Sequence, residues 1–185
     1  MALSPILGLN AEEGVVLPSD YLKPRWYAAY TCANHERSVR DQLEQRSVES
    51  FLPDYETVRR WKDRRIRIML PLFPGYVFVH LALRDRLRVL QIPSVVRLVG
   101  FGGQPAVLLD QEIEGLRQGL AREMGIEPYP YLRVGHRVRV RNGPLQGMEG
   151  MLVRKKNGSR LVISLGLIMR SVAVEIDLAE LEPVR

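Results

Sequence analysis

The chain has 185 residues, enough for one domain or two small ones, and its 46% hydrophobic and 26% charged content excludes wholesale disorder. A formal net charge of +6 favours a polyanionic partner, with nucleic acid first and an anionic membrane second. The single cysteine, Cys32, excludes an internal disulfide and fits a cytoplasmic protein, and no apolar run is long enough to span a bilayer.

The first predicted elements are a strand and a helix. Residues 1–22 have no basic start and carry two glutamates, so we expect a loosely ordered N-terminal extension rather than a signal peptide. The segment WYAAYT predicts a short strand. The apolar stripe in HERSVRDQLEQRSVE predicts a helix from about His35 to Arg46, with Asn34 as its N-cap. Three strands are predicted to follow, near residues 51–61, 64–70 and 75–81.

The next elements complete a first domain over residues 23–121. LRDRLRVL predicts a short helix and SVVRLVG another strand, and Gly102-Gly103 predicts a turn. Asp110 is expected to cap a final helix whose apolar stripe is Ile113, Leu116 and Leu120. This order predicts an α+β sandwich, in which helices flank an antiparallel sheet.

The composition changes after this helix. Pro128 and Pro130 disfavour helix, so residues 122–133 are interpreted as an interdomain linker. Beyond it, HRVRVR, MEGMLVRK, RLVISL, RSVAVEI and LEPV alternate apolar with polar residues. Residues 134–185 therefore predict a small β barrel of SH3-like size.

Two sets of motifs resemble one known family. VRVRNGPLQGMEG resembles a KOW motif, with Gly143, Pro144, Gly147 and Gly150 as its turn residues; Gly143 and Gly147 would suit positive φ or close backbone approach. RWYAAYT, LFPGYVFV and IPSVVRLVGFGGQPAVLL resemble, in order and spacing, the NGN domain of NusG-type transcription factors. The joint resemblance covers residues 24–184. Its helix sequence and its long KOW loop are similar to the specialised RfaH and UpxY types.

The stretch PLFPGYVFVH poses a choice between a core strand and a surface that binds a partner. The residues alone favour the core. The resemblance instead implies an aromatic surface that receives the clamp helices of the largest subunit of bacterial RNA polymerase. The matching positions are Trp26, Phe73 and Tyr76. Strand alternation puts Phe78 on the face of Tyr76, which adds it to this surface, and turns Val77 and Val79 towards the helices.

A cluster of basic residues occupies the predicted hairpin at residues 59–67. On a projecting tip these side chains could contact the DNA backbone, while an aromatic side chain stacks on a base. Such contacts give affinity without sequence preference, and a solvated hairpin is the alternative. The candidate DNA-binding residues of the hairpin are Arg59, Arg60, Trp61, Lys62, Arg64 and Arg65.

The resemblance implies further contacts elsewhere in the first domain. The start of the first helix would meet the non-template DNA strand through Asn34, His35, Arg37 and Arg40, although helix capping and solvation explain these residues equally well. Arg86, Leu87 and Arg88 lie where RfaH-like proteins touch the polymerase gate loop. The threonine-rich triplet of those relatives is missing, which leaves a solvated helix face as an even alternative.

The apolar loop residues Leu167, Ile168 and Met169 have three possible roles. They could bind a partner such as a ribosomal protein or Rho, pack against the first domain, or fill the end of the barrel. RfaH-like proteins also suggest a KOW domain that switches to a helical hairpin. Alternating β-branched residues, with Gly158 and Gly166 nearby, predict strands here instead.

Catalysis is not expected. His35, His80 and His136 are scattered, no phosphate loop or nucleophile elbow is present, and we expect neither metal nor cofactor. The resulting hypothesis is a monomeric, operon-specific antitermination factor that suppresses pausing and termination. The alternatives are a housekeeping NusG-type factor that couples polymerase to Rho or the ribosome, and a ribosome-associated KOW protein that binds RNA.

Overall fold

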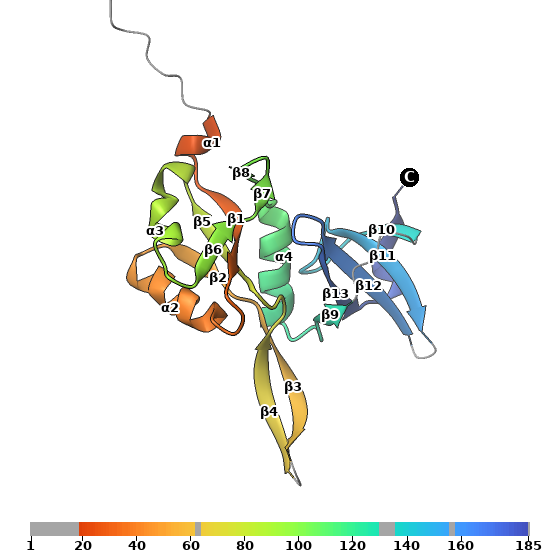
Figure 1. Cartoon of the computed structure of the whole chain (residues 1–185). Coiled ribbons are helices and arrows are strands. Elements are labelled where there is room, and N and C mark those ends of the chain that lie inside the picture. The colour runs from red at the N-terminus through yellow and green to blue at the C-terminus, as the bar shows by residue number, and fades with distance from the viewer. Residues whose placement is uncertain (1–18, 62–63, 130–135, 156–157, 185) are drawn as a thin grey trace, which may run out of the picture.

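The computed structural model describes residues 19–61, 64–129, 136–155 and 158–184 (Figure 1). Its first part mixes helices with strands, and its last part is built from strands. In chain order the first elements are α1 (Ser19–Leu22), β1 (Arg25–Thr31), α2 (Glu36–Gln45), β2 (Glu49–Phe51), β3 (Asp54–Trp61), β4 (Arg64–Pro71), β5 (Tyr76–Leu81), the 3-10 helix η1 (Leu83–Asp85), α3 (Leu87–Leu90), β6 (Val95–Leu98), β7 (Gly100–Phe101), β8 (Gln104–Pro105) and α4 (Asp110–Ala121).

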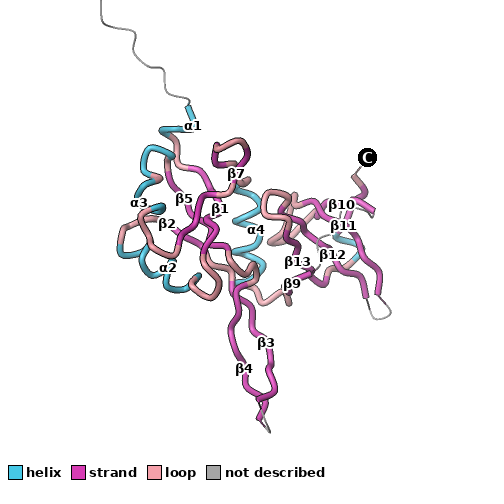
Figure 2. Tube along the Cα trace, viewed as in Figure 1, coloured by secondary structure: helices cyan, strands magenta, loops and turns pink. Residues whose placement is uncertain are grey.

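A four-stranded antiparallel sheet, ordered β2-β5-β1-β6, separates two layers of helices (Figure 2). Alternation along β1 sends Tyr27 and Ala29 into a core shared with Val39 of α2 and Val89 of α3. On the opposite face of the sheet, Trp26 and Ala28 of β1 belong to a second core, which includes residues of α4. The sheet is therefore buried on both faces, and as expected Val77 and Val79 point to the α2 side and Phe78 to the α4 side.

Strands β3 and β4 leave this sheet and form a two-stranded hairpin of their own (Figure 1). Each strand has eight residues, and the pairing runs without interruption from Asp54↔Pro71 to Trp61↔Arg64. Beyond its base, the hairpin projects away from the packed part of the molecule. The long arm predicted from the basic cluster is therefore present.

The C-terminal sheet consists of six antiparallel strands, β14-β10-β11-β12-β13-β9. Its strands are β9 (Glu127–Tyr129), β10 (His136–Val140), β11 (Glu149–Lys155), β12 (Gly158–Leu165), β13 (Arg170–Glu175) and β14 (Leu181–Pro183), with the 3-10 helix η2 (Leu178–Glu180) before the last. Five of the six match the five predicted strands. The sixth, β9, lies in the range interpreted as linker and pairs with the edge of β13.

The C-terminal sheet packs against α4, and two helical glycines make this contact possible. A Cβ atom on Gly115 would lie 2.3 Å from Sδ of Met148, and one on Gly119 would lie 3.2 Å from Cδ2 of Leu145. Gln111 of α4 also donates from Nε2 to the carbonyl oxygen of Gln146 at 3.0 Å. Because both glycines lack a side chain, the loop before β11 approaches the helix backbone closely.

The predicted fold class, an α+β domain followed by a strand-rich domain, is confirmed. Two helix starts were predicted wrongly. Asn34 has a φ of 62° and forms a turn, so that His35 is the N-cap of α2, without a side-chain cap. Asp110 is the first helical residue of α4, and the Glu112 carboxylate accepts from the N–H of Leu109 instead. Strand β2 and helix α1 were not predicted.

We predict that Gly115→Leu separates α4 from the C-terminal sheet, because a side chain there would overlap Met148. Overpacking of this kind costs about 1–3 kcal/mol. The change should appear as large shifts of the Met148 methyl resonance and as faster, independent tumbling of the two parts. Gln118→Leu, on an exposed position of the same helix, should leave both observables unchanged. An unshifted Met148 methyl in Gly115→Leu would contradict the prediction.

Candidate functional site

Most of the predicted aromatic surface is buried in this arrangement. Phe73 is 1% exposed and Trp26 6%, and both belong with Phe78 to one cluster that also holds residues of α4 and of the C-terminal sheet. The expectation that Phe73 points outward is therefore not met. The physical reason is that α4 and the C-terminal sheet extend the core over this face of the four-stranded sheet. A role of these residues in binding stays a prediction.

One end of the same face remains accessible. Tyr76 is half-buried, and its ring lies 5.4 Å from that of Tyr30, which is directly opposite on β1 and 38% exposed. On the next strand the Arg97 guanidinium lies 5.9 Å from the centroid of the Tyr30 ring. The three side chains form a row across strands β5, β1 and β6. Sequence reasoning missed Tyr30 and Arg97, although Tyr30 is four residues from Trp26 and thus on its face.

The turn before β5 is held by a buried carboxylate. Glu36, the first residue of α2, is 4% exposed, and its Oε1 accepts the N–H of Gly75 at 2.6 Å. Gly75 has a φ of +84°, and a Cβ atom there would lie 3.3 Å from the Tyr30 ring. The Pro-Gly turn that carries Phe73 and leads into Tyr76 is thus fixed from the α2 side.

At the other end of the face, Arg117 of α4 lies between two aromatic rings. Its guanidinium is 5.4 Å from the centroid of Trp26 and 5.3 Å from that of Phe51. His80 stacks on Trp26 with ring centroids 5.0 Å apart, and its Nδ1 lies 2.9 Å from Oε2 of Glu49. These contacts give His80 a structural role in the sheet. Arg117 secures α4 over the part of the face that contains Trp26.

The hairpin presents its arginines to solvent on both faces. The register puts Arg60 opposite Arg65 on one face, and Arg59 opposite Ile66 on the other. Arg59, Arg60, Arg64 and Arg65 are all exposed. The side chain of Trp61 and all of Lys62 lie outside the described residues. The hairpin therefore offers a cationic surface that can bind phosphate groups without sequence preference.

Of the predicted DNA-contact residues at the start of α2, Arg40 is half-buried and the others are exposed, and three of the four have local partners. Nη2 of Arg37 donates to the Met69 carbonyl oxygen at 2.7 Å, which ties α2 to the base of the hairpin. Arg40 pairs with Asp41 at 2.8 Å, and Nδ1 of His35 lies 2.9 Å from the carbonyl oxygen of Ala33. Of these contacts, the Arg37 hydrogen bond orients α2 with respect to the hairpin.

The predicted gate-loop residues differ in their contacts within the protein. Arg86 contacts the Tyr21 hydroxyl at 3.4 Å and donates to the Leu83 carbonyl at 3.2 Å. Arg88 donates to the Arg46 carbonyl oxygen. Leu87, between them, is 58% exposed. Leu87 is thus available to a partner, whereas the two arginines already bond to described parts of the protein.

The KOW-motif residues form the loop that meets α4. Gly143 and Gly147 have positive φ, as the sequence predicted, and a Cβ on Gly150 would lie 2.5 Å from the Val162 carbonyl oxygen. Pro144 is half-buried beside them. In the loop before β13, Ile168 is buried in the cluster shared with α4, Leu167 packs against that cluster, and Met169 is exposed. The region is strand and turn, as predicted, rather than a helical hairpin.

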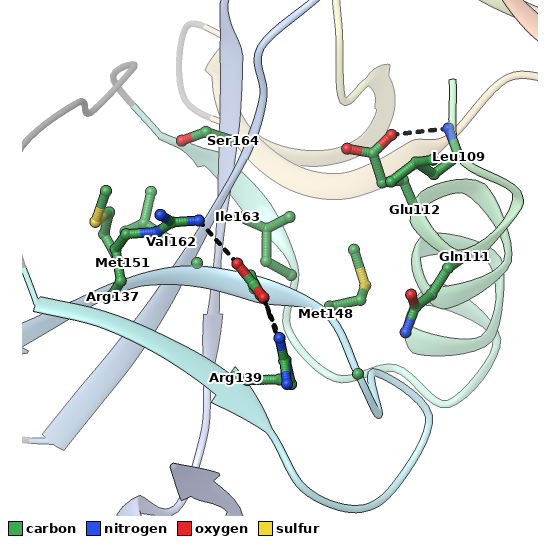
Figure 3. Close-up of a pocket in the computed structure, with 13 residues that line it drawn as sticks. Leu109, Gln111, Glu112, Arg137, Arg139, Met148, Met151, Val162, Ile163 and Ser164 are labelled. Atoms are coloured by element: carbon green, nitrogen blue, oxygen red, sulfur yellow. Dashed lines mark hydrogen bonds and ion pairs between the residues drawn. The ribbon is translucent and has the colours of Figure 1, made fainter. Parts of the chain in front are cut away.

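A cavity of about 920 Å³ lies between the start of α4 and the C-terminal sheet (Figure 3). Burial raises the pKa of Glu112, against the opposing effect of its hydrogen bond from Leu109. Across the cavity, the hydrogen bond from Arg139 lowers the pKa of Glu149, whose carboxylate also pairs with Arg137 at 2.9 Å. Glu149 thus compensates part of the positive charge of the two arginines on this wall.

The described residues offer neither a metal site nor a membrane-spanning helix. None of their His, Cys, Asp and Glu side chains gather in groups of three that could hold a metal ion. Among the described helices, none has the length and hydropathy to cross a membrane. The arrangement offers an aromatic surface and a cationic arm, both suited to binding.

The fold and these surfaces define a two-domain protein, an α+β sandwich joined to a strand-rich domain. The family model described as "Transcription termination factor nusG" matches residues 24–117. The chain belongs to the NusG family. It is 28% identical over 177 residues to the transcription termination/antitermination protein NusG of Lactococcus lactis, covering 86% of this chain and 93% of the relative.

Two further comparisons agree with this assignment. The chain is 28% identical over 180 residues to the protein of the same name from Escherichia coli K12, covering 89% of this chain and 98% of the relative. A structure titled "Domain interaction in Thermotoga maritima NusG" shares the fold, with a TM-score of 0.55 and 23% identity, over 88% of this chain and 98% of that chain. The two relatives carry the same description, a transcription termination/antitermination protein.

We predict that Glu36→Ala destabilises the protein by about 1–3 kcal/mol, because it leaves the N–H of Gly75 without its acceptor in a buried turn. Urea denaturation measures the loss, and the Tyr30 and Tyr76 ring resonances should shift with it. The control is Glu44→Ala, on an exposed position of α2, which should stay within about 0.5 kcal/mol of the parent. Equal effects of both substitutions would count against the role of Glu36.

We predict that Glu112→Gln raises the melting temperature at pH 7 but not at pH 4. The pKa of Glu112 is raised in the folded state, so folding favours its protonated form. Its stabilising contribution therefore falls as pH rises from the unfolded pKa, about 4.3, through the folded one. Glutamine keeps an acceptor for the Leu109 N–H without the charge. Glu114→Gln, at a half-exposed carboxylate paired with Arg117, should give no such gain.

Proposed function

We propose that this protein binds RNA polymerase through the aromatic face of its first domain and suppresses pausing and termination. The partner segment is the pair of clamp helices of the largest subunit. The observation that supports this best is the accessible Tyr76–Tyr30 pair, which continues into Phe73 and Phe78 in the region matched by the NusG family model. Aromatic anchors next to a larger apolar surface are typical of binding hot spots.

Full use of this face requires the C-terminal sheet to move. Phe73 and Phe78 are almost completely buried, so a partner that reaches them must replace contacts now made within the protein. The described arrangement is then a closed state, and the partner selects an open one. Because only open molecules bind, the apparent affinity for polymerase falls as the closed fraction rises. The contact between α4 and the C-terminal sheet would therefore regulate binding.

The hairpin supplies a second attachment, to DNA. Phosphate contacts by its arginines, together with the clamp contact, would bridge two parts of a transcription complex. Bridging raises the free energy of the clamp opening that accompanies pausing. A coupling of about 1–3 kcal/mol changes a pause equilibrium roughly 5- to 150-fold. The protein acts in this way in the cytoplasm, as a monomer.

The distribution of ion pairs argues against RNA binding by the C-terminal sheet as the main function. Arg137 and Arg139 pair with Glu149, and Arg141 lies 3.7 Å from Glu182. These pairs compensate much of the positive charge on the outer face of β10, with two glutamates for three arginines. The exposed Met169 remains available to a ribosomal protein or to Rho, as in the housekeeping alternative.

We expect the exposed side chains of Asn34 and His35 to recognise the non-template strand of particular operons. Affinity for paused complexes that differ only in their non-template sequence tests this expectation. A general, housekeeping factor would bind all of them equally.

We predict that Tyr76→Ala lowers the affinity for core RNA polymerase about 30-fold, from the ~2 kcal/mol typical of a hot-spot residue. Fluorescence anisotropy of the labelled protein, titrated with core polymerase in the absence of nucleic acid, measures the change. Unfolding in urea checks that the variant is folded. The control is Leu178→Ala, at an exposed apolar residue of η2, which should bind as the parent does. Unchanged binding of a folded Tyr76→Ala variant would refute the proposed surface.

A further inference from the structure

We propose that Arg60 and Arg65 together clamp one phosphodiester group of a nucleic-acid strand, on one defined face of the β3–β4 hairpin. This inference deepens the proposed function and rests on its nucleic-acid contact. It goes further by assigning a site, a ligand group and a stoichiometry of two guanidinium groups for each phosphate. The argument comes from the strand register and from the ion pairs of the described residues.

The register brings two like charges together. Arg60 and Arg65 are directly opposite in an uninterrupted antiparallel ladder, where Cβ atoms of such a pair are about 4.5–5.5 Å apart. Like charges in this position destabilise a hairpin. Both side chains are exposed, and neither has an ion pair or hydrogen bond with a described side chain. The pair is therefore a local repulsion that a bound anion would remove.

Three other strand arginines of the described residues have an acidic partner instead. Arg67, on the same face, contacts Glu56 at 3.3 Å. In the C-terminal sheet, Arg139 is directly opposite Glu149 and Arg160 directly opposite Glu175, and both pairs form ion pairs. Of these three arginines and Arg60, Arg60 alone has another arginine directly opposite on the neighbouring strand.

The chemistry of the missing counter-ion follows from the donors. A guanidinium offers a planar fork that matches two oxygens of a phosphate or carboxylate. Two converging forks suit a group whose two free oxygens point apart, which is the arrangement of a phosphodiester. Its single negative charge leaves the complex net positive, so neighbouring phosphates of a strand are attracted as well. An isolated phosphate ion lacks those neighbours, so we expect a strand to bind far better.

The opposite face of the hairpin supplies a matched control. Arg59 precedes Arg60 in the chain and is also exposed, but its partner across the ladder is Ile66. Arg59 and Arg65 therefore point to different faces and cannot share one phosphate. Substitutions at Arg59 change the net charge by the same amount without touching the clamp.

A double-mutant cycle with the full-length protein tests the clamp. The parent, Arg60→Ala, Arg65→Ala and the double variant are titrated with a 20-base-pair duplex and with its single strand over a range of salt concentrations. If one phosphate is shared, either single variant should lose most of the contact, and the double variant should lose little more. The salt-dependence slope for duplex should then fall by about 0.9 in the double variant, the value for one phosphate, rather than about 1.8.

The control cycle combines Arg59→Ala with Arg65→Ala and should be additive, with a slope loss of about 1.8. Coupling with duplex alone or with single strand alone supports the clamp and identifies its ligand. Additive effects of Arg60→Ala and Arg65→Ala, or coupling equal to that of the control cycle, would overturn it. Binding of each variant to core polymerase without nucleic acid is measured in parallel, so that failure of the clamp is distinguished from failure of the aromatic surface.

A second measurement separates binding from hairpin stability. Arg60→Glu places a carboxylate opposite Arg65, so the hairpin amides of the free protein should exchange with solvent more slowly, while DNA affinity falls. Arg59→Glu faces Ile66, so it should lower affinity without slowing exchange. Inorganic phosphate alone should leave exchange in the parent almost unchanged. Faster or unchanged exchange in Arg60→Glu would show that the two arginines do not repel each other, and would overturn the proposal.

Discussion

The absence of side chains at Gly115 and Gly119 is the constraint on which the closed structure depends. Glycine in a helix interior is disfavoured by about 1 kcal/mol relative to alanine, so α4 gives up stability at two positions. The missing side chains let Met148 and Leu145 approach the helix backbone, and both residues join the core that α4 shares with the four-stranded sheet. That core then extends over Phe73. Burial of the aromatic face follows from the shape of one helix surface.

Charge is distributed unequally between the two parts of the protein. On the outer face of β10, Arg137 and Arg139 pair with Glu149, and Arg141 lies 3.7 Å from Glu182, so much of the positive charge there is compensated within the protein. The hairpin has exposed arginines on both faces, and Arg59, Arg60 and Arg65 form no ion pair with a described side chain. Exposed positive charge is therefore concentrated on the projecting hairpin. Glu36 and Arg37 connect α2 to the turn of the aromatic face and to the base of this arm, and so hold the two surfaces in a fixed relation.

The strands could be predicted from sequence because alternation is a local property, and even the division of Phe78 and Val79 between two faces followed from it. Burial of Phe73 could not, because it depends on a helix and a sheet far along the chain. Asn34 failed as a cap since a residue that caps helices also accepts positive φ in turns. The partners of Arg37 and Arg86 were equally out of reach, because each joins segments that are distant in sequence.

Strand β9 shortens the connection between the two parts. It pairs with β13 and is tied to it through Arg160, which bonds both Glu127 and Glu175, so only residues 122–126 separate it from α4. That tether spans at most about 20 Å when fully extended. A sheet released from α4 therefore stays at an effective concentration of order millimolar. A partner that bound the aromatic face would therefore compete with the tethered sheet for the same surface.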